Sequence, residues 1–323
     1  MQTKQHKEAF VSVVIPVYED PERLKTCLRA LERQSYPDDR YEIIVVDNGP
    51  EGSIEPSISK SASIRFVREN KRGSYAARNK GIAVSRGEIL AFTDADCIPS
   101  TDWIEKGVSH VSFEHNCGLV AGNIEVFPRD PDNSTICEHY DRLFGFQQEY
   151  WITTEGFGAT GNLFTSKDVL DKVGIFDPAI KSLGDVEWCR RVASSGYNLY
   201  YGHDVCVRHP ARHSLTQLFR KNVRIAGGSY QIDEKRMSRV AVIEKLRYSL
   251  VPSMKGIKNS FGVVFSDSHL RGTSQKLQVL LIRMFLRYSR RWITLLLSTR
   301  NRIRDLRCWK NREPKFHTLH KKR

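Results

Sequence analysis

The first hundred residues alternate between short apolar runs and segments with the periodicity of amphipathic helices. Four apolar runs are predicted to be buried strands, at residues 10–15, 41–46, 64–67 and 88–93. Helices are predicted between them, at residues 21–34 and 75–84. Strands that alternate with helices at this spacing predict an α/β fold with a mostly parallel sheet, flanked by helices and joined by right-handed crossovers.

The rest of the chain is less regular. Two more helices and two more strands are predicted, at residues 167–173, 185–195, 198–201 and 205–208. From Leu215 onwards the sequence has a helical pattern and is rich in basic residues. We find no internal repeat and no low-complexity tract.

Polar or charged residues follow three of the predicted strands, in the motifs PVYED, DNG and DAD. Parallel α/β sheets bind their ligands beyond the carboxyl ends of the strands. Three such ends on one edge therefore predict a binding site there.

The stretch AFTDADC places Asp94 and Asp96 directly after an apolar run. Residues two apart in an extended chain share a face, so the two carboxylates are expected to converge. Like charges held close together need a cation between them. A hard divalent cation such as Mg²⁺ or Mn²⁺ prefers oxygen ligands and fits this role. The alternative is that both aspartates belong to an ordinary turn after a strand.

The charge of the chain is unevenly distributed. Of its 51 basic and 37 acidic residues, 28 basic and 6 acidic residues lie at positions 208–323. The front of the chain is therefore mildly acidic and the back strongly basic. This asymmetry predicts that the back meets an anionic surface, either nucleic acid or membrane lipid.

Seven cysteines are scattered along the chain without any CxxC spacing. This pattern argues against a zinc ribbon and gives no disulfide framework, so we expect reduced thiols in a cytoplasmic protein. The first sixteen residues lack the long apolar core of a signal peptide.

Six motifs in order, SVVIPVYED, YEIIVVDNG, NKRGSYAARNKGIAVSRGEILAFTDADC, GATGNLFTSKDVLDKVGIFD, GDVEWCRRV and VRHPARHSL, resemble a known family. The chain is similar to the inverting family 2 glycosyltransferases of the Rossmann-like GT-A fold, over roughly residues 10–228. The resemblance implies a nucleotide-sugar transferase domain at residues 1–228. The basic, helical C-terminal extension would then occupy residues 229–323.

The resemblance also implies a nucleotide-sugar donor, most often a UDP-sugar, and one divalent metal, Mn or Mg. Asp47 would accept a hydrogen bond from the base, its alternative being an Asx turn in DNG. Arg78 would lie near the diphosphate, its alternative being a solvated helix residue, and Gly73 would let the backbone pass close to the ligand. The residues implied to bind the nucleotide-sugar are Pro16, Val17, Tyr18, Glu19, Asp47, Gly73, Arg78, Asp94, Ala95 and Asp96.

Asp96 would bind the metal directly in this family, and Asp94 would lie near the ribose and the metal. The metal would bridge the two phosphates and neutralise the leaving group. His209 would complete the metal shell, because imidazole is a suitable further ligand. The nearby His213 competes for this role.

The motif GDVEWC would supply the catalytic base. Asp185 would take the proton from an acceptor hydroxyl, which then attacks the anomeric carbon from the face opposite the nucleotide and inverts its configuration. Asp185 is also a good N-cap, and many relatives have Gly-Glu-Asp here, which leaves Glu187 as the alternative base. The residues implied to line the acceptor and donor-sugar pocket are Gly161, Asn162, Glu187 and Trp188. A core role for Trp188 and a turn at Gly161-Asn162 are their alternatives.

Residues 277–297 are long enough to span a membrane but contain four arginines, each of which opposes insertion. On a helical wheel Arg283, Arg287 and Arg290 lie on one side. Six apolar or aromatic residues lie on another: Leu277, Leu281, Met284, Tyr288, Trp292 and Leu295. This pattern predicts a helix in the membrane surface, and residues 300–312 add charge for anionic lipid. The alternative is a helix docked on the catalytic domain with its arginines in water.

Together these features predict a peripheral enzyme at the inner face of the plasma membrane, acting on a glycan or lipid-linked acceptor. A catalytically silent scaffold is the main alternative, and the presence of Asp94, Asp96 and Asp185 argues against it. Nucleic-acid binding is not expected, because strand-end carboxylates repel phosphates and no reading module is present. A sugar nucleotidyltransferase would need a glycine-rich phosphate loop, which PVYEDPERL is not.

Overall fold

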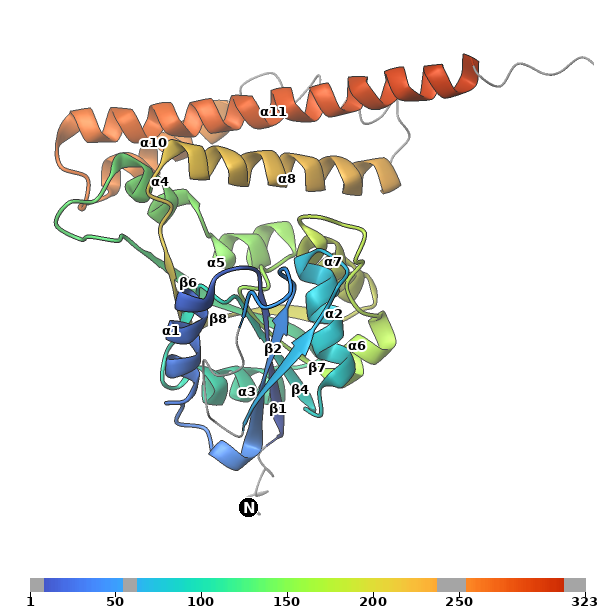
Figure 1. Ribbon diagram of the computed structural model, residues 1–323. Helices are drawn as coiled ribbons and strands as arrows, with labels where there is room; N and C mark the ends of the chain where they lie inside the picture. The colour runs from blue at the N-terminus through green and yellow to red at the C-terminus, as the bar shows by residue number, and fades with distance from the viewer. Residues whose placement is uncertain (1–8, 55–62, 237–253, 311–323) are drawn as a thin grey trace, which may run out of the picture.

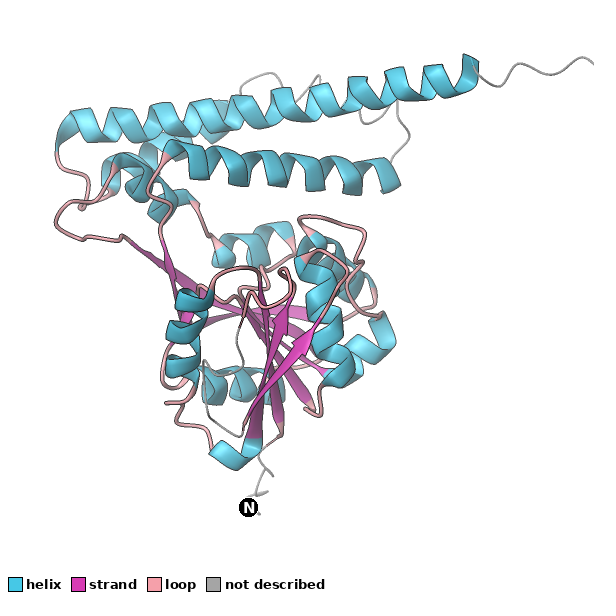
Figure 2. Cartoon of the chain, viewed as in Figure 1, coloured by secondary structure: helices cyan, strands magenta, loops and turns pink. Residues whose placement is uncertain are grey.

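The computed structural model describes residues 9–54, 63–236 and 254–310. Its centre is one eight-stranded sheet with the strand order β3-β2-β1-β4-β7-β6-β8-β5. Helices lie on both sides of the sheet, and a separate group of helices lies above its upper edge (Figures 1 and 2). The strands are β1 (Val11–Val17), β2 (Tyr41–Asp47), β3 (Ile64–Arg68), β4 (Ile89–Thr93), β5 (Ile98–Pro99), β6 (Cys117–Phe127), β7 (Asn162–Ser166) and β8 (Asn198–Pro210).

The front half of the sheet is parallel, as the alternating pattern predicts. β1 pairs with β2 on one side and β4 on the other, and β3 follows β2, all in parallel register. β7 then runs antiparallel to both β4 and β6, whereas β6 and β8 are parallel. The mixed sheet flanked by helices confirms the predicted α/β class.

Side chains alternate along β1 and supply two separate cores. Val13 and Ile15 contact one layer, which contains the apolar faces of α1 and α3. Val14 contacts the opposite layer, formed by α2, α6 and α7. The helices of these two layers are α1 (Pro21–Leu31), α2 (Ser74–Val84), α3 (Trp103–Phe113), α6 (Lys167–Val173) and α7 (Gly184–Ser194).

Pro16 lies inside β1, whereas the sequence predicted that it ends the strand. The pairing of β1 with β4 stops at Val14 and Phe92, so Pro16 lies beyond the β4 ladder. Its missing N–H therefore removes no bond on that side of the strand.

Residues 198–210 form one strand, whereas two short strands were predicted there. The register between β6 and β8 shifts after Gly122, so part of β8 bulges away from the ladder. Asn162 lies under this bulge, and its amide donates 2.8 Å hydrogen bonds to the carbonyls of Asn123 and Val205. The Asn162 oxygen accepts the Trp103 indole N–H at 2.9 Å. One buried side chain thus holds the irregular half of the sheet together.

A second group of helices forms its own apolar cluster beside the sheet. Its buried residues include Phe144, Leu218, Val264 and Leu286, one from each of four helices. The predicted domain boundary after residue 228 falls inside one of these helices, α8, which continues to Arg236. The remaining helical elements are α4 (Ile136–Phe144), α8 (Leu215–Arg236), α10 (Met254–Ser266), α11 (Gly272–Lys310), the short α5 (Gln148–Tyr150), the 3₁₀ turn η1 (Asp38–Arg40) and the π-helical turn η3 (Trp151–Glu155).

The long helix α11 lies along α8 at the top of the molecule (Figure 1). Arg283 lies 3.8 Å over the Phe144 ring of α4, and the Arg290 Nε donates to Asn222 of α8 at 2.7 Å. The helix is therefore docked, but these two arginines are used in the docking and do not point only into water. On its outer side Leu281 and Trp292 are 64% and 57% exposed. No helix within the described residues is long and apolar enough to cross a membrane.

Asn162→Ala is expected to lower the free energy of unfolding by roughly 2–4 kcal/mol, because three buried polar groups lose their partner. Urea unfolding followed by circular dichroism measures this loss. Asn198→Ala is the matched control, since Asn198 is exposed and its loss is expected to cost less than about 1 kcal/mol. Equal losses of stability in the two variants would contradict the role of the buried Asn162 hydrogen bonds in holding the sheet together.

Candidate active site

One cavity of about 960 Å³ lies beyond the carboxyl ends of β1 and β4. Its other walls come from the end of β8, the start of α7, and the helices α4, α8 and α11. Eleven residues expected from the sequence line it: Pro16, Val17, Tyr18, Gly73, Arg78, Asp94, Ala95, Asp96, Gly161, Asp185 and His209. Residues far apart in the chain therefore meet on one concave surface.

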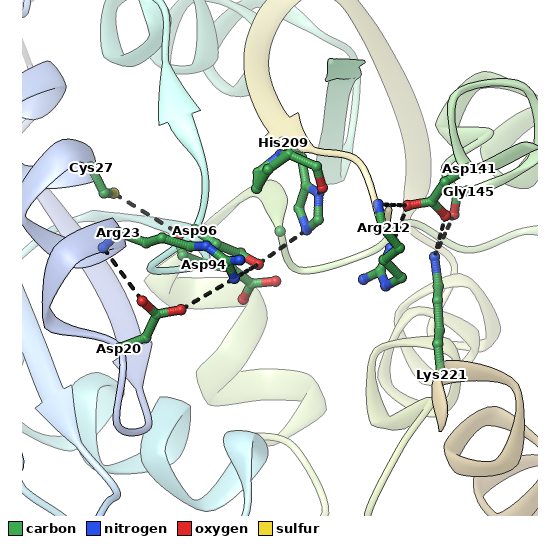
Figure 3. A network of polar contacts seen from close by, with 12 residues as sticks. Asp20, Arg23, Cys27, Asp94, Asp96, Asp141, Gly145, His209, Arg212 and Lys221 are labelled. Carbon is green, nitrogen blue, oxygen red and sulfur yellow. Dashed lines mark hydrogen bonds and ion pairs between the residues drawn. The ribbon is translucent and has the colours of Figure 1, made fainter. Parts of the chain in front are cut away.

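Asp94 and Asp96 both face this cavity, but each is balanced by a different cation. Strand β4 ends at Thr93, so the two carboxylates lie in a turn and not on an extended chain. Asp94 forms an ion pair with Arg78, which α2 carries into the site as a buried side chain. Asp96 lies 3.3 Å from the Nε2 of His209 and 4.0 Å from the Nη1 of Arg23 (Figure 3).

His209 is held so that one ring nitrogen points at Asp96. Its Nδ1 lies 2.8 Å from the carbonyl of Pro210, which can only accept, so Nδ1 carries the hydrogen. The ring also packs against Phe146, with centroids 4.8 Å apart. Burial raises the pKa of Asp96, but the charges of His209 and two arginines outweigh burial and leave the pKa below its usual value.

Asp185 lies at the first turn of α7 and is held by three donors. The Tyr75 hydroxyl and the Val186 backbone N–H both donate to its Oδ1, at 3.1 and 3.0 Å. The Thr160 N–H donates to Oδ2 at 3.4 Å. Burial raises the pKa of Asp185, although Arg78 and these donors oppose the rise. A carboxyl group whose pKa is raised in this way suits a general base.

The family model named "Glycosyl transferase family 2" matches residues 12–174. The chain belongs to this family. It is also 40% identical over 229 residues to the glycosyltransferase AglE of Haloferax volcanii, a match that covers 69% of this chain and 74% of AglE. The protein is therefore a glycosyltransferase.

Two further relatives match this glycosyltransferase along more than two thirds of their own length. The first is the "Dolichyl N-acetyl-alpha-D-glucosaminyl phosphate 3-beta-D-2,3-diacetamido-2,3-dideoxy-beta-D-glucuronosyltransferase" of Methanococcus voltae. It is 19% identical over 227 residues, covering 66% of this chain and 71% of that protein. The second is the structure of the mannosyltransferase PcManGT from Pyrobaculum calidifontis in complex with GDP-Man and Mn²⁺. Its TM-score is 0.53 at 16% identity, covering 91% of this chain and 76% of that one. This likeness confirms the GT-A fold.

Five residues expected at the site of the glycosyltransferase lie outside the cavity lining that the described residues form. Asp47 accepts from Gly49 N–H and the Ser53 hydroxyl, which is the Asx turn that the sequence left open. Glu187 pairs with Arg191 one turn along α7, and Trp188 is fully buried with its N–H on the Gly174 carbonyl. The other two are Glu19, which is exposed, and Asn162, which is buried beneath the β8 bulge. The histidine alternative, His213, is exposed as well.

Sequence reasoning missed several residues that shape the cavity. Asn48 follows Asp47, and its amide donates to the carbonyls of Glu69 and Lys71 while its oxygen accepts the Gly73 N–H. This fixes the loop in which Gly73 adopts a φ of 132°, a value that glycine tolerates. Asn48 was visible in the DNG motif, whereas no local pattern marks Tyr75 as the partner of Asp185.

A basic wall closes the end of the cavity away from Asp94. We define this wall as Arg212, Lys221, Arg283 and Arg290, all of which line the cavity. Asp141 of α4 accepts from Arg212 at 2.9 Å and lies 3.7 Å from Lys221 (Figure 3). Burial and the charges of Arg212, Arg224 and Arg290 together lower the pKa of Lys221 to about 7, against the opposing effect of Asp141. Asp141 is one carboxylate beside four basic side chains, so the basic wall keeps a net positive charge.

The depressed pKa of Lys221 makes the stability of the enzyme depend on pH. In the unfolded chain this lysine keeps its proton up to a pKa of about 10.5, whereas in the folded chain it loses it near pH 7. The unfolded state binds more protons in this window, so the free energy of unfolding rises from pH 7 to 10. Lys221→Met is expected to remove this rise, measured by urea unfolding at four pH values. Lys172→Met, on an exposed site, should keep it, and an unchanged slope in Lys221→Met would contradict the assignment.

Proposed function

We propose that this glycosyltransferase moves a sugar from a nucleotide-diphosphate sugar, with UDP-sugars as the first candidates, to a hydroxyl of a glycan or lipid-linked acceptor. Transfer inverts the anomeric carbon. The observation that carries the proposal is that Asp185 and the group Asp94, Asp96 and His209 line one cavity. In an inverting transfer, the base and the leaving group act from opposite faces of one bound sugar. Both groups must therefore line the same cavity.

The donor binds at the end of the cavity formed by β1, β4 and α2. Pro16, Val17, Tyr18 and Ala95 supply its walls, and Gly73 lets the backbone approach the nucleotide. Asp47 and Glu19 belong to the proposed nucleotide site through the family resemblance alone. The bound nucleotide-sugar of PcManGT supports this class of donor.

Asp96 and His209 fit a divalent metal as two of its ligands. Their 3.3 Å separation is close to the roughly 3 Å between adjacent ligands of an ion that binds each at about 2.0–2.1 Å. The Nδ1–H of His209 is already bonded, which leaves the Nε2 lone pair for the metal. The described residues contain no group of three metal-binding side chains, so diphosphate oxygens and water would fill the remaining positions. When bound, Mn²⁺ or Mg²⁺ neutralises the charge that develops on the leaving diphosphate.

Asp185 acts as the general base. Its carboxylate accepts the proton of the acceptor hydroxyl while that oxygen attacks the anomeric carbon, and correct placement contributes roughly 10²–10⁴-fold to the rate. The donors Tyr75, Val186 and Thr160 fix the orientation of the carboxylate. Glu187 is bonded to Arg191 on the next turn and does not line the cavity, which supports Asp185 over Glu187.

A membrane surface is the proposed place of action, and a lipid-linked glycan the proposed acceptor. The name of the Methanococcus voltae relative describes an acceptor on dolichyl phosphate, which supports this class. Exposed apolar side chains gather on the C-terminal helices: Phe261, Val263, Phe265, Leu277, Leu281, Met284, Phe285, Trp292 and Leu296. With the basic back half of the chain, this surface suits an anionic lipid layer at the inner face of the plasma membrane.

Release of the nucleotide diphosphate from a panel of UDP-, GDP- and dTDP-sugars, with Mn²⁺ or Mg²⁺, tests the donor and metal assignments. We expect metal-dependent hydrolysis of one donor, and a loss of at least about 100-fold in Asp96→Ala. Asp185→Asn should keep donor binding but lose about 10²–10⁴-fold in transfer. Glu187→Gln is the matched control and should lose little of the transfer rate.

Two outcomes of this assay would count against the proposal. If the wild type binds no nucleotide with any donor or metal, the protein is a silent relative that serves as a scaffold. If Glu187→Gln abolishes transfer while Asp185→Asn does not, the base is Glu187.

Co-sedimentation with vesicles tests the membrane surface. The wild type should bind phosphatidylglycerol vesicles more tightly than phosphatidylcholine vesicles. Leu281→Glu and Trp292→Glu should each weaken binding about tenfold, because each removes an exposed apolar side chain that would insert into the lipid layer. Ile175→Glu changes an exposed apolar residue outside the C-terminal helices and should bind like the wild type. Equal loss in all three variants would exclude this face as the lipid contact.

A further inference from the structure

The basic wall lies in the same cavity as the proposed donor site, yet it comes from a different part of the chain. Arg212, Lys221, Arg283 and Arg290 all follow residue 174, where the family match ends. Arg212 follows β8, Lys221 lies on α8, and the last two lie on α11. The donor end of the cavity already has its own cation, Arg78, paired with Asp94. The basic wall therefore faces the part of the cavity that the donor leaves open.

Two of the four cations have no carboxylate to balance them. Arg283 donates to the Ser260 hydroxyl at 3.2 Å, and Arg290 donates to the Asn222 amide oxygen at 2.7 Å. Within the part of the chain that the structure describes, neither guanidinium forms an ion pair. Arg283 also bonds to the Tyr140 hydroxyl. Arg290 donates through its Nε, so its terminal N–H groups remain to contact a ligand.

Asp141 does not neutralise the other two cations completely. It is one carboxylate shared between Arg212 and Lys221, and it is fully buried behind them. Lys221 also lies 4.5 Å from the centre of the Phe146 ring and donates to the Gly145 carbonyl. Guanidinium and ammonium groups gathered in this way match the oxygens of a phosphate or diphosphate.

The helices that carry the basic wall also carry exposed apolar side chains. Phe219 of α8 and Phe285 of α11 stack with centroids 6.0 Å apart, and both are exposed. Leu281, two residues before Arg283, is exposed as well. A ligand with a phosphate and an apolar chain can therefore contact the wall and the outer side of the same helix pair.

We propose that the basic wall binds the phosphate or diphosphate group that joins the acceptor sugar to its lipid. This assignment rests on the proposed transfer to a lipid-linked acceptor and names the residues that would recognise that acceptor. The phosphate is held between α8 and α11, the lipid chain leaves along their exposed apolar faces, and the sugar hydroxyl extends towards Asp185.

Calorimetric titration with octyl phosphate below its micellar concentration tests the site directly. The buffer contains EDTA and no nucleotide-sugar, so neither the metal nor the donor contributes. The titration is run at pH 6, below the pKa of Lys221 of about 7, so that this lysine is protonated. We expect binding by the wild type, and affinity weaker by about tenfold or more in Arg290→Gln and Lys221→Gln, since each removes a charged donor. Arg287→Gln is the matched control, because Arg287 lies on α11 between the two wall arginines but does not line the cavity. It removes the same charge and should change affinity less than twofold.

Control ligands separate the contribution of the phosphate group to binding from that of the alkyl chain. Octanol carries the same chain without phosphate, and its binding should be insensitive to Arg290→Gln. Glucose 1-phosphate and inorganic phosphate carry the anion without the chain and should bind more weakly than octyl phosphate. If they bind as tightly, with the same sensitivity to Arg290→Gln, the phosphate site stands but its lipid source is overturned.

The proposal is overturned if octyl phosphate does not bind, or if Arg287→Gln weakens binding as much as Arg290→Gln does. The second result would mean that diffuse surface charge attracts the ligand. Circular dichroism of each variant guards against loss of folding, and two independent wall variants keep the test decisive. Because the titration needs no turnover, failure of the proposed transferase reaction leaves this result interpretable.

Discussion

The rest of the site depends on the repulsion between two carboxylates that follow one strand. Asp94 and Asp96 follow β4 and face one cavity, and two like charges held so close need counter-charges. Arg78 from α2 balances the first, and His209 from β8, with Arg23 from α1, balances the second. Satisfying two aspartates therefore brings three distant elements to one edge of the sheet. A divalent ion and a diphosphate would occupy an environment whose charges are already arranged.

The parts of the fold that could be predicted are those with strong local patterns. The strands β1 to β4 and the helices between them follow from apolar runs and helical spacing, because these signals need no knowledge of distant residues. β6 was missed, since Gly118 and Gly122 interrupt its apolar run. Gly122 is needed there because a Cβ would lie 2.2 Å from the Val205 carbonyl. The continuity of β8 was missed because its bulge is held by Asn162 from another strand, a contact that no local pattern shows.

The site was predictable where a motif fixes the backbone and less so where helix phase decides. Asp185 faces the cavity, but Glu187 is two residues further and points to Arg191, and Trp188 points to the core. At 100° per residue Glu187 lies about 200° around the helix from Asp185 and cannot share its direction. Trp188 lies on nearly the same side as Asp185, so its burial in the core depends on tertiary packing that the motif does not show. The inward contacts of Arg283 could not be foreseen, because a helical wheel separates faces without saying which one meets the protein.

The close contact between α8 and the loop before α7 makes the C-terminal helices part of the structure that holds the cavity. A Cβ at Gly228 would lie 2.2 Å from the carbonyl of Ser182, three residues before Asp185, so the two backbones touch. Leu183 next to it adopts a left-handed φ of 64°, a conformation that only surrounding packing sustains. Gly228 of α8 has no side chain that could adjust between the helix and this loop. A force that displaces α8, such as adsorption of its exposed face to a surface, would therefore act directly on the backbone of the loop. A displacement of α8 would therefore move the loop that leads to Asp185.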